Sequence, residues 1–431
     1  MERLLFLRRP SGASLHEKRS FVIRPRPNWE TIHGSLATPR GFRAAAVAAG
    51  IKKAARALDL ALIFSDSPRT TAAGMFTTNR VVAAPVVLSC RNLKESRGRC
   101  RAVLINAGNA NACTGRAGLH AAERSARTAA KLLGLSSNQV LVASTGVIGV
   151  PLRIDLILNR LRNLTESLSV ENAVAVPGAI MTTDTFPKTC VLRTEVGSKS
   201  VYLAGVAKGA GMIHPRLATM LSFITTDASV AAGDLRKMLR AAVESSFNRI
   251  TVDGDTSTND TVLVLASGLS GVRVRCGTRS GALFLAGLTE LCQTLARLVA
   301  RDGEGAKKLV TIEVSGARTQ ADAGRIARAI ANSLLVKTAI AGSDPNWGRI
   351  ICAAGYSGAK FDPTKVDIHI NDFVLCREGL DAGFDEAAAK RELDRKELTI
   401  RLDLHQGKAS TRFWTCDLTH EYITINASYR T

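Results

Sequence analysis

The chain of 431 residues is long enough for about two to three domains of roughly 150 residues each. Hydrophobic residues make up 46% of it and charged residues 22%, so we expect a packed core and exclude extensive disorder. No uninterrupted apolar run reaches the roughly 18 residues that a spanning helix needs, so we expect a soluble protein that does not bind membranes.

The formal net charge is +21, and residues 1–60 carry 12 Lys and Arg against 4 Asp and Glu. The basic residues are otherwise scattered, without a Lys/Arg block or an aromatic RNA-binding motif, so we do not expect nucleic acid as the partner. Diffuse positive charge instead raises the local concentration of small anionic substrates. Nine isolated Cys without a C-x-x-C pair and seven dispersed His predict reduced thiols and no metal site.

Residues 1–33 form an Arg-rich extension without the apolar region of a secretory signal peptide. We expect this extension to be disordered and the protein to be cytoplasmic. Import into mitochondria by a basic transit peptide is the alternative.

From residue 42 the chain alternates strand-like and helix-like segments. Apolar or alternating runs predict strands at 42–51, 59–66, 261–268, 307–317, 365–376, 397–404 and 421–429. Within 101–115 a strand should end in a Gly/Asn loop, and within 139–152 a strand should end in a Thr-Gly loop. Apolar residues at helical spacing predict helices at 121–135, 153–168, 231–247, 281–303 and 320–336. No dinucleotide-binding or P-loop motif follows a strand. We therefore predict an α/β fold, a layered α/β sandwich with helices outside and a smaller C-terminal α/β region.

The stretch 208–223, "KGAGMIHPRLATMLSF", places Thr219 where a glycine-rich loop meets an apolar strand. A threonine hydroxyl is a poor nucleophile unless a base removes its proton, and a free α-amine with a pKa of about 7.7–8.0 can be that base. Thr219 is internal, so its hydroxyl would first have to attack the preceding carbonyl and cleave the Ala218–Thr219 bond. Most threonines at strand starts have no catalytic role, so this pattern alone leaves both interpretations open.

Several longer segments carry a resemblance to a known family. They are "GFRAAAVAAGIK", "INAGNANACTG", "STGVIG", "MTTDTFPK", "KGAGMIHPRLATML", "DGDTSTNDT", "RDGEGAKKLV", "SDPNWGRI" and the terminal "INASYRT". In this order they resemble the ornithine acetyltransferase family (glutamate N-acetyltransferase, ArgJ), from about residue 34 to the last residue.

The resemblance implies self-cleavage between Ala218 and Thr219 into an α chain (34–218, after the extension) and a β chain (219–431). Thr219 would accept the acetyl group of N2-acetyl-L-ornithine and pass it to L-glutamate, a ping-pong cycle in arginine biosynthesis. The fold implied is an α/β sandwich similar to N-terminal-nucleophile hydrolases, in an α2β2 heterotetramer without a cofactor. Some members also accept acetyl-CoA, and no CoA-phosphate motif in this sequence decides that point. The alternative is a self-processing hydrolase that uses water as acceptor.

The resemblance also assigns the site residues one by one. Thr145 and Gly146 are expected in a strand-to-helix loop as the oxyanion hole, where losing one donor typically costs about 10²–10³ in rate. Besides Thr219, the resemblance implies that Lys208 binds the α-carboxylate and that Glu304 binds the ornithine ammonium. Asn426 and Thr431, near the C-terminus, are implied to close the pocket. One threonine of "MTTDTFPK" should also contact the substrate, and we favour Thr182 over Thr183 and Thr185.

Overall fold

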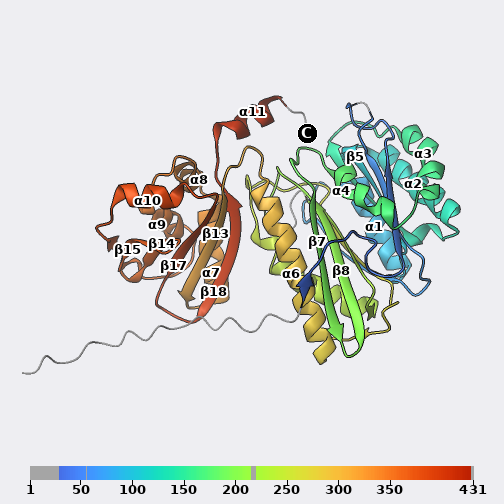
Figure 1. Ribbon diagram of the computed structural model, residues 1–431. Helices are drawn as coiled ribbons and strands as arrows, with labels where there is room; N and C mark the ends of the chain where they lie inside the picture. Colours follow the sequence, from blue (N-terminus) through green and yellow to red (C-terminus); the bar gives the residue numbers. More distant parts are fainter. Residues whose placement is uncertain (1–28, 55, 215–219, 429–431) are drawn as a thin grey trace, which may run out of the picture.

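Two face-to-face sheets form the N-terminal part of the computed structural model, which describes residues 29–54, 56–214 and 220–428 (Figure 1). In the described ranges the larger sheet has the strand order β1-β7-β8-β9-β11-β4. Its strands are β1 (Glu30–Thr31), β4 (Thr71–Phe76), β7 (Lys188–Val196), β8 (Lys199–Lys208), β9 (Leu221–Thr226) and β11 (Thr261–Ala266). The second sheet consists of β2 (Phe42–Val47), β3 (Leu60–Ser65), β5 (Ala102–Asn109) and β6 (Val140–Val147).

An apolar layer fills the space between the two sheets. Ile63 and Ile105 of the second sheet meet Phe223 and Leu265 of the larger one in a single buried cluster. Because these strands are covered on both faces, they appear in the sequence as continuous apolar runs and not as alternating ones.

Helices cover the outer face of each sheet. The larger sheet carries α5 (Ala232–Glu244) and α6 (Arg279–Arg301), and the second sheet carries α1 (Ala84–Glu95), α2 (Gly115–Leu133) and α3 (Ile154–Glu166). The short α4 (Val176–Ile180) packs at the edge of the layer between the sheets. This helix–sheet–sheet–helix stack confirms the predicted layered α/β sandwich with helices outside.

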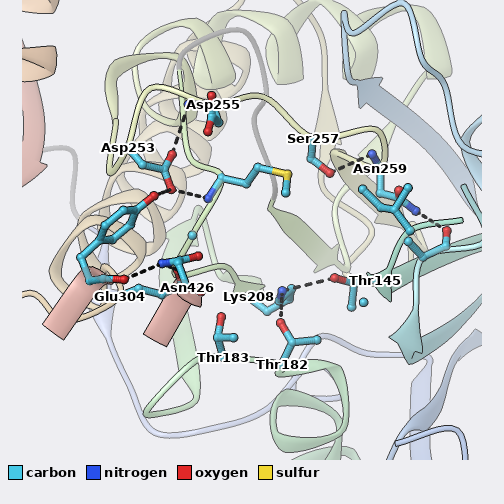
Figure 2. Close-up of a pocket in the computed structure, with 16 residues that line it drawn as sticks. Thr145, Thr182, Thr183, Lys208, Asp253, Asp255, Ser257, Asn259, Glu304 and Asn426 are labelled. Atoms are coloured by element: carbon cyan, nitrogen blue, oxygen red, sulfur yellow. Dashed lines mark hydrogen bonds between the residues drawn. The ribbon is translucent and has the colours of Figure 1, made fainter. Parts of the chain in front are cut away.

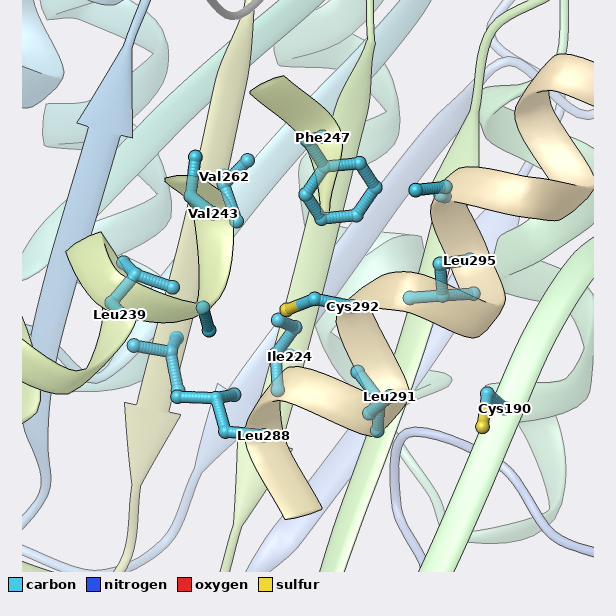
Figure 3. Close-up of a cluster of buried hydrophobic side chains, with 14 of the residues drawn as sticks. Cys190, Ile224, Leu239, Val243, Phe247, Val262, Leu288, Leu291, Cys292 and Leu295 are labelled. Atoms are coloured by element: carbon cyan, nitrogen blue, oxygen red, sulfur yellow. The ribbon is translucent and has the colours of Figure 1, made fainter. Parts of the chain in front are cut away.

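Helix α6 is the longest helix of the sandwich, and by length and composition alone it could cross a membrane. Its Leu288, Leu291 and Leu295 are instead fully buried, in a cluster with Ile224 of the sheet and Phe247 after α5 (Figure 3). This packing is that of a core helix.

The C-terminal unit has its own sheet and its own core. Within the described residues its strand order is β16-β15-β14-β17-β13-β18. The strands are β13 (Leu309–Ala317), β14 (Asp367–Ile370), β15 (Phe373–Arg377), β16 (Leu380–Asp381), β17 (Glu397–Asp403) and β18 (Ala409–Cys416). The helices are α7 (Gln320–Asn332), α8 (Leu334–Ala341), α9 (Trp347–Gly355) and α10 (Glu386–Leu393). Trp414 and Cys416 of β18 join the sandwich core beside α6, so the two units pack together.

The remaining elements are short. Strands β10 (Ser229–Val230) and β12 (Arg273–Val274) pair in parallel. Single 3₁₀ turns lie at Ser137–Gln139, Glu171–Ala175, Phe247–Arg249 and Pro363–Lys365. Helix α11 (His420–Ser428) leaves the C-terminal unit and extends above the junction of the two units (Figure 1).

The fold begins earlier than the sequence predicts. Trp29 donates its indole N–H to the carbonyl of Leu283 at 2.9 Å, and β1 pairs antiparallel with β7. A side chain at position 287 would collide with the Trp29 ring at 2.2 Å, so Gly287 makes room for it. Residues 29–33 therefore belong to the sandwich, while residues 1–28 of the expected extension lie outside the described ranges.

The expected helix at 320–336 is in fact two helices. It divides at Ser333, whose extended backbone ends α7 and whose hydroxyl accepts a hydrogen bond from the backbone N–H of Val336 to cap α8. Helix α2 starts at Gly115, six residues before the expected position 121.

The strand expected at 421–429 is wrong, because α11 occupies residues 421–428 of it. Its β-branched residues Ile423 and Thr424 favour a strand by propensity, but no described strand lies beside them to pair with. The Thr419 hydroxyl accepts a hydrogen bond from the backbone N–H of Glu421 at the start of this turn, so local capping favours the helix.

Candidate active site

A pocket of about 90 Å³ lies between the sandwich and α11 (Figure 2). Its walls come from β6, the end of β8, the 253–259 loop, the segment after α6, and α11. Its lining includes Thr145, Gly146, Thr182, Thr183, Lys208, Met212, Asp253, Asp255, Ser257, Asn259, Glu304, Tyr422 and Asn426. In the described ranges no group of three His, Cys, Asp or Glu side chains could hold a metal ion.

Lys208 is the last residue of β8, and its side chain is only 3% exposed. Its ammonium donates to the Thr182 hydroxyl at 2.7 Å and to the Thr145 hydroxyl at 3.3 Å (Figure 2). Burial lowers the pKa of Lys208, and the carboxylate of Asp184 at 3.8 Å opposes that shift. A largely desolvated ammonium that faces a pocket is suited to bind the carboxylate of a small ligand.

Asp184 holds this side of the pocket together. Its carboxylate accepts hydrogen bonds from the Lys188 ammonium and the Gly209 backbone N–H, both at 2.6 Å, and from the Thr182 backbone N–H at 3.1 Å. Burial by itself would raise the pKa of Asp184, but the charges of Lys208 and Lys188 lower it to about 2. Asp184 therefore fixes Thr182 relative to the end of β8, and it is charged at neutral pH.

Thr145 and Gly146 lie inside β6 and not in the loop that the sequence predicts. At this point the pairing with β5 is irregular, because Asn109 faces both Thr145 and Val147. Gly146 has φ +131°, and a Cβ on it would lie 2.3 Å from the carbonyl carbon of Gly108. Only glycine allows this close approach, which exposes the Gly146 backbone to the pocket.

Asn259 braces the same strand from the 253–259 loop. Its side-chain amide donates to the carbonyls of Ser144 at 2.8 Å and Ala110 at 2.7 Å. The backbone on both sides of the β5–β6 irregularity is therefore held by one buried side chain.

Carboxylates gather on the other side of the pocket. Glu304, 8% exposed, accepts a hydrogen bond from the side-chain amide of Asn426 on α11 at 2.8 Å (Figure 2). Its carboxylate fills the space that a Cβ of Gly211 would need, at 2.4 Å. Asp253, held near the Tyr422 hydroxyl at 3.4 Å, and Asp255 add further negative charge.

Carboxylates also anchor the chain on either side of residues 215–219. Asp253 accepts from the backbone N–H groups of Met212 at 2.6 Å and Ile213 at 2.9 Å, and Asp260 accepts from that of Met220 at 3.0 Å. Burial raises the pKa of both carboxyl groups. Ala218 and Thr219 themselves lie outside the described residues, so the expected nucleophile and cleavage site remain predictions.

Six of the expected site residues meet in this one pocket: Thr145, Gly146, Thr182, Lys208, Glu304 and Asn426. Of the two other threonines considered, Thr183 also lines the pocket, whereas Thr185 hydrogen-bonds Asp302. Thr431 lies outside the described residues.

The sequence interpretation gave no role to Asp184, Asp253, Asp255, Asn259, Asp260 or Tyr422. For the four residues between 253 and 260 the available signal was a loop, "DGDTSTNDT", in which acidic, amide and hydroxyl side chains directly precede the buried strand β11. With an ammonium on one side and carboxylates on the other, the pocket is complementary to a small amino acid that carries a carboxylate and an amine.

The profile of the ArgJ family matches residues 43–431. A protein named arginine biosynthesis bifunctional protein ArgJ, from Symbiobacterium thermophilum, is 50% identical over 404 residues, which cover 93% of this chain and 100% of the relative. A protein of the same name from Geobacter sulfurreducens is 48% identical over 394 residues, which cover 91% and 99%. A relative from Oryza sativa subsp. japonica, named as chloroplastic, is 44% identical over 419 residues, which cover 95% and 90%.

Two solved structures are also similar. The ArgJ protein of Bacillus halodurans has 47% identity and a TM-score of 0.48, and the match covers 49% of this chain and 100% of that one. An ornithine acetyltransferase from Mycobacterium tuberculosis, complexed with ornithine, has 39% identity and a TM-score of 0.40, with coverages of 43% and 98%. Because the family profile spans nearly the whole chain and full-length relatives share about half of its residues, the chain belongs to the ArgJ family.

Proposed function

We propose that this protein transfers the acetyl group of N2-acetyl-L-ornithine to L-glutamate, with Thr219 as the nucleophile. The observation that carries the proposal is the pocket itself. Lys208, Thr145, Thr182, Glu304 and Asn426 come from separate segments and meet in one small cavity. The cavity lies beside the start of β9, two residues after Thr219.

In the proposed cycle the chain first cleaves itself. The Thr219 hydroxyl attacks the carbonyl carbon of Ala218, the C–N bond breaks, and water hydrolyses the resulting ester. Thr219 then has a free α-amine with a pKa of about 7.7–8.0 that can accept the hydroxyl proton near neutrality.

Acetyl transfer then follows in two halves. The Thr219 oxygen attacks the acetyl carbonyl of acetylornithine, the amide C–N bond breaks, and ornithine leaves with the proton. The amine of glutamate attacks the acetyl ester, and the hydroxyl of Thr219 is restored. The donors of Thr145 and Gly146 stabilise the oxyanion in both halves.

The charges of the pocket assign the ends of each substrate. Lys208 binds the α-carboxylate that acetylornithine and glutamate share, and Thr182 lies beside it. Glu304, with Asn426, binds the side-chain ammonium of ornithine, and Thr431 is proposed to help close the pocket. Because the relatives are named bifunctional, we include acetyl-CoA as a second donor.

Intact mass and a donor assay test this proposal. Purified protein should give two fragments that divide between residues 218 and 219, and Thr219→Ala should stay uncut and inactive. Acetylornithine with glutamate should yield acetylglutamate and ornithine. An uncut wild-type chain with full activity would refute the mechanism, and free acetate as the main product would identify a hydrolase that uses water.

We further propose that the enzyme acts in the cytoplasm as an α2β2 heterotetramer. The alternative, mitochondrial import, is tested by fusing residues 1–33 to a fluorescent protein in a eukaryotic cell. Mitochondrial fluorescence would overturn the cytoplasmic assignment.

A further inference from the structure

A chain of buried charged side chains lies beside the site pocket. The Lys188 ammonium donates to the carboxylate of Asp184 at 2.6 Å and to that of Asp302 at 2.5 Å. The side chains of Lys188 and Asp184 are 0% exposed, and that of Asp302 is 2% exposed. We call Asp184, Lys188 and Asp302 the ion triad. With Lys208, whose ammonium lies 3.8 Å from Asp184, the triad forms a buried group of two positive and two negative charges.

The Asp184 end of the ion triad holds the cationic side of the pocket. Asp184 accepts hydrogen bonds from the backbone N–H of Thr182 and from that of Gly209, the residue after Lys208. The Thr182 hydroxyl in turn accepts a hydrogen bond from the Lys208 ammonium (Figure 2). The ammonium that is proposed to bind the α-carboxylate therefore has a fixed position relative to Asp184.

The Asp302 end of the ion triad holds the acidic side of the pocket. Asp302 is the C-cap of α6 and lies two residues before Glu304. A negative charge at the C-terminus of a helix is unfavourable because of the helix dipole, so the stability of α6 alone does not explain it. Asp302 instead accepts hydrogen bonds from Lys188 and from both the backbone N–H and the hydroxyl of Thr185. One carboxylate thus ties the loop that carries Thr182 to the segment that carries Glu304.

A second connection between the two sides runs through the backbone. The N–H of Glu304 donates to the carbonyl of Ala210 at 2.9 Å. Ala210 lies between two glycines, Gly209 and Gly211, and glycine-rich backbone is conformationally permissive. This connection alone therefore does not set a distance. The ion triad, whose three members are all buried and hydrogen-bonded, is the rigid connection.

The distance between the two sides matters because both proposed amino-acid substrates have the same length. The side-chain nitrogen of ornithine and the side-chain carboxylate oxygens of glutamate are separated from the α-carbon by the same number of bonds. N2-acetyl-L-lysine has one more methylene, so its ammonium cannot reach Glu304 in the same way while its carboxylate stays on Lys208. One methylene is worth about 10-fold to 200-fold in discrimination between substrates.

We propose that the ion triad fixes the distance between Lys208 and Glu304, and that Lys188 thereby makes the pocket selective for the chain length of ornithine. This inference rests on the proposed acetyl transfer and deepens it, because it assigns the selectivity for the donor. Lys188 is a positioning residue, since it is fully buried and acts through its two carboxylate partners. A rigid spacing admits ornithine and glutamate and excludes the longer lysine derivative.

Rates of acetyl transfer to glutamate from N2-acetyl-L-ornithine and from N2-acetyl-L-lysine test the proposal. The wild-type enzyme should prefer acetylornithine at least about tenfold in kcat/KM. Thr185→Val removes the hydroxyl that bonds Asp302 and leaves the charges of the triad paired. It should reduce the preference about threefold to tenfold, by raising the KM for acetylornithine while kcat changes little.

Two further variants are the controls for Thr185→Val. Thr185→Ser keeps the hydroxyl and should retain the wild-type preference. Thr189→Val, the same change at an exposed position of β7, should also retain it. An equal fall of the preference in Thr185→Ser or Thr189→Val would show that the contact with Asp302 is not the cause, and would overturn the proposal.

A double variant tests Lys188 itself. Lys188→Met combined with Asp302→Asn removes one positive and one negative charge, so Asp184 and Lys208 remain as a neutral pair. The preference for acetylornithine should fall to within about threefold, while transfer from both donors continues. Circular dichroism and the melting midpoint check that the variant is folded. If it does not fold, the result with Thr185→Val decides alone.

The remaining outcomes separate this inference from the proposed function. Equal kcat/KM for the two donors in the wild type, or an unchanged preference in Thr185→Val, would overturn the positioning role alone. A folded double variant that is less stable but has an unchanged preference would show that the ion triad only stabilises the fold, and would also overturn it. Absence of transfer from acetylornithine in the wild type would overturn the proposed function.

Discussion

At the scale of single residues, Gly146 of β6 and Gly149, just after this strand, differ in how much space their surroundings leave for a side chain. Gly146 has φ +131° and lies against the backbone of Gly108, whereas Gly149 has φ +79° and no described atom within 4 Å of the point where a Cβ would lie. Both conformations disfavour a Cβ, but only the first leaves no space for one. The shape of the proposed oxyanion hole therefore depends on Gly146.

Gly146→Ala should separate β5 from β6 and abolish acetyl transfer, with a loss of more than about 2 kcal/mol in unfolding free energy. The matched control Gly149→Ala should lose only about 1 kcal/mol and keep its activity. Urea unfolding and the acetylornithine assay check both variants. Equal effects of the two substitutions would contradict the geometry described for Gly146.

The charge of Asp184, beside the pocket, makes the stability of the fold depend on pH in the acid range. Its pKa falls from the ordinary 3.8 to about 2 in the folded chain, chiefly because Lys208 and Lys188 outweigh the effect of burial. The stability that the charged Asp184 contributes to the fold is therefore complete above about pH 4 and is lost as the pH falls from 3.8 towards 2. The shift corresponds to about 2 kcal/mol.

Asp184→Asn should lower the unfolding free energy at pH 7 by about 3–5 kcal/mol, because the buried Lys208 loses its nearby carboxylate and the buried Lys188 keeps only that of Asp302. The deficit relative to wild type should shrink by about 2 kcal/mol between pH 5 and pH 2. Urea titrations across this range measure it, with the exposed Asp155→Asn as control. A deficit that stays constant with pH would show that Asp184 has no depressed pKa.

At the scale of elements, α11 combines a functional position with little packing. None of its described side chains is buried, yet Asn426 bonds Glu304 and Tyr422 lines the pocket. A helix with so little buried apolar area contributes little to stability. Its contribution is to cover the carboxylate side of the pocket.

Removal of residues 420–431 should therefore change the melting midpoint only slightly and lower kcat/KM for acetylornithine at least tenfold. The physical reason is that Glu304 loses its amide partner and the pocket opens to water. Calorimetry and initial rates measure the two effects. As a control, Ile423→Ser alters a side chain that is 68% exposed on the same helix and should leave both values unchanged. A large loss of stability on truncation would indicate that α11 belongs to the core.

At the scale of the whole molecule, the proposed cleavage site does not coincide with a boundary between structural units. Strands β8 and β9, which precede and follow residues 215–219, pair antiparallel from Leu203 with Thr226 to Lys208 with Leu221. Helix α6, which follows the site in sequence, packs on β7 and β8, which precede it. The two chains would thus share one sheet and one core.

The two fragments should therefore copurify after self-cleavage and separate only in denaturant. Native mass spectrometry should give about twice 45.9 kDa, as expected for two cleaved copies, and denaturing electrophoresis should give two bands. Fragments that elute separately from a native gel-filtration column would contradict the shared sheet.

The sequence by itself determined the layers of this protein. Apolar runs such as 60–65 and 261–266 became strands buried on both faces, because such runs are stable only between two covering layers. Its motifs also named six residues that the fold brings into one pocket. These features are local, since each depends on a hydrophobic periodicity or on a short sequence motif.

Only the tertiary structure decided features that depend on what lies beside a segment. The segment 421–428 is a helix because no described strand is available to it, and Gly146 lies in a strand because β5 approaches it closely. Lys208 is buried because Asp184, distant in sequence, supplies its countercharge. Pairing, burial and charge compensation are contacts between distant residues, so no local pattern contains them.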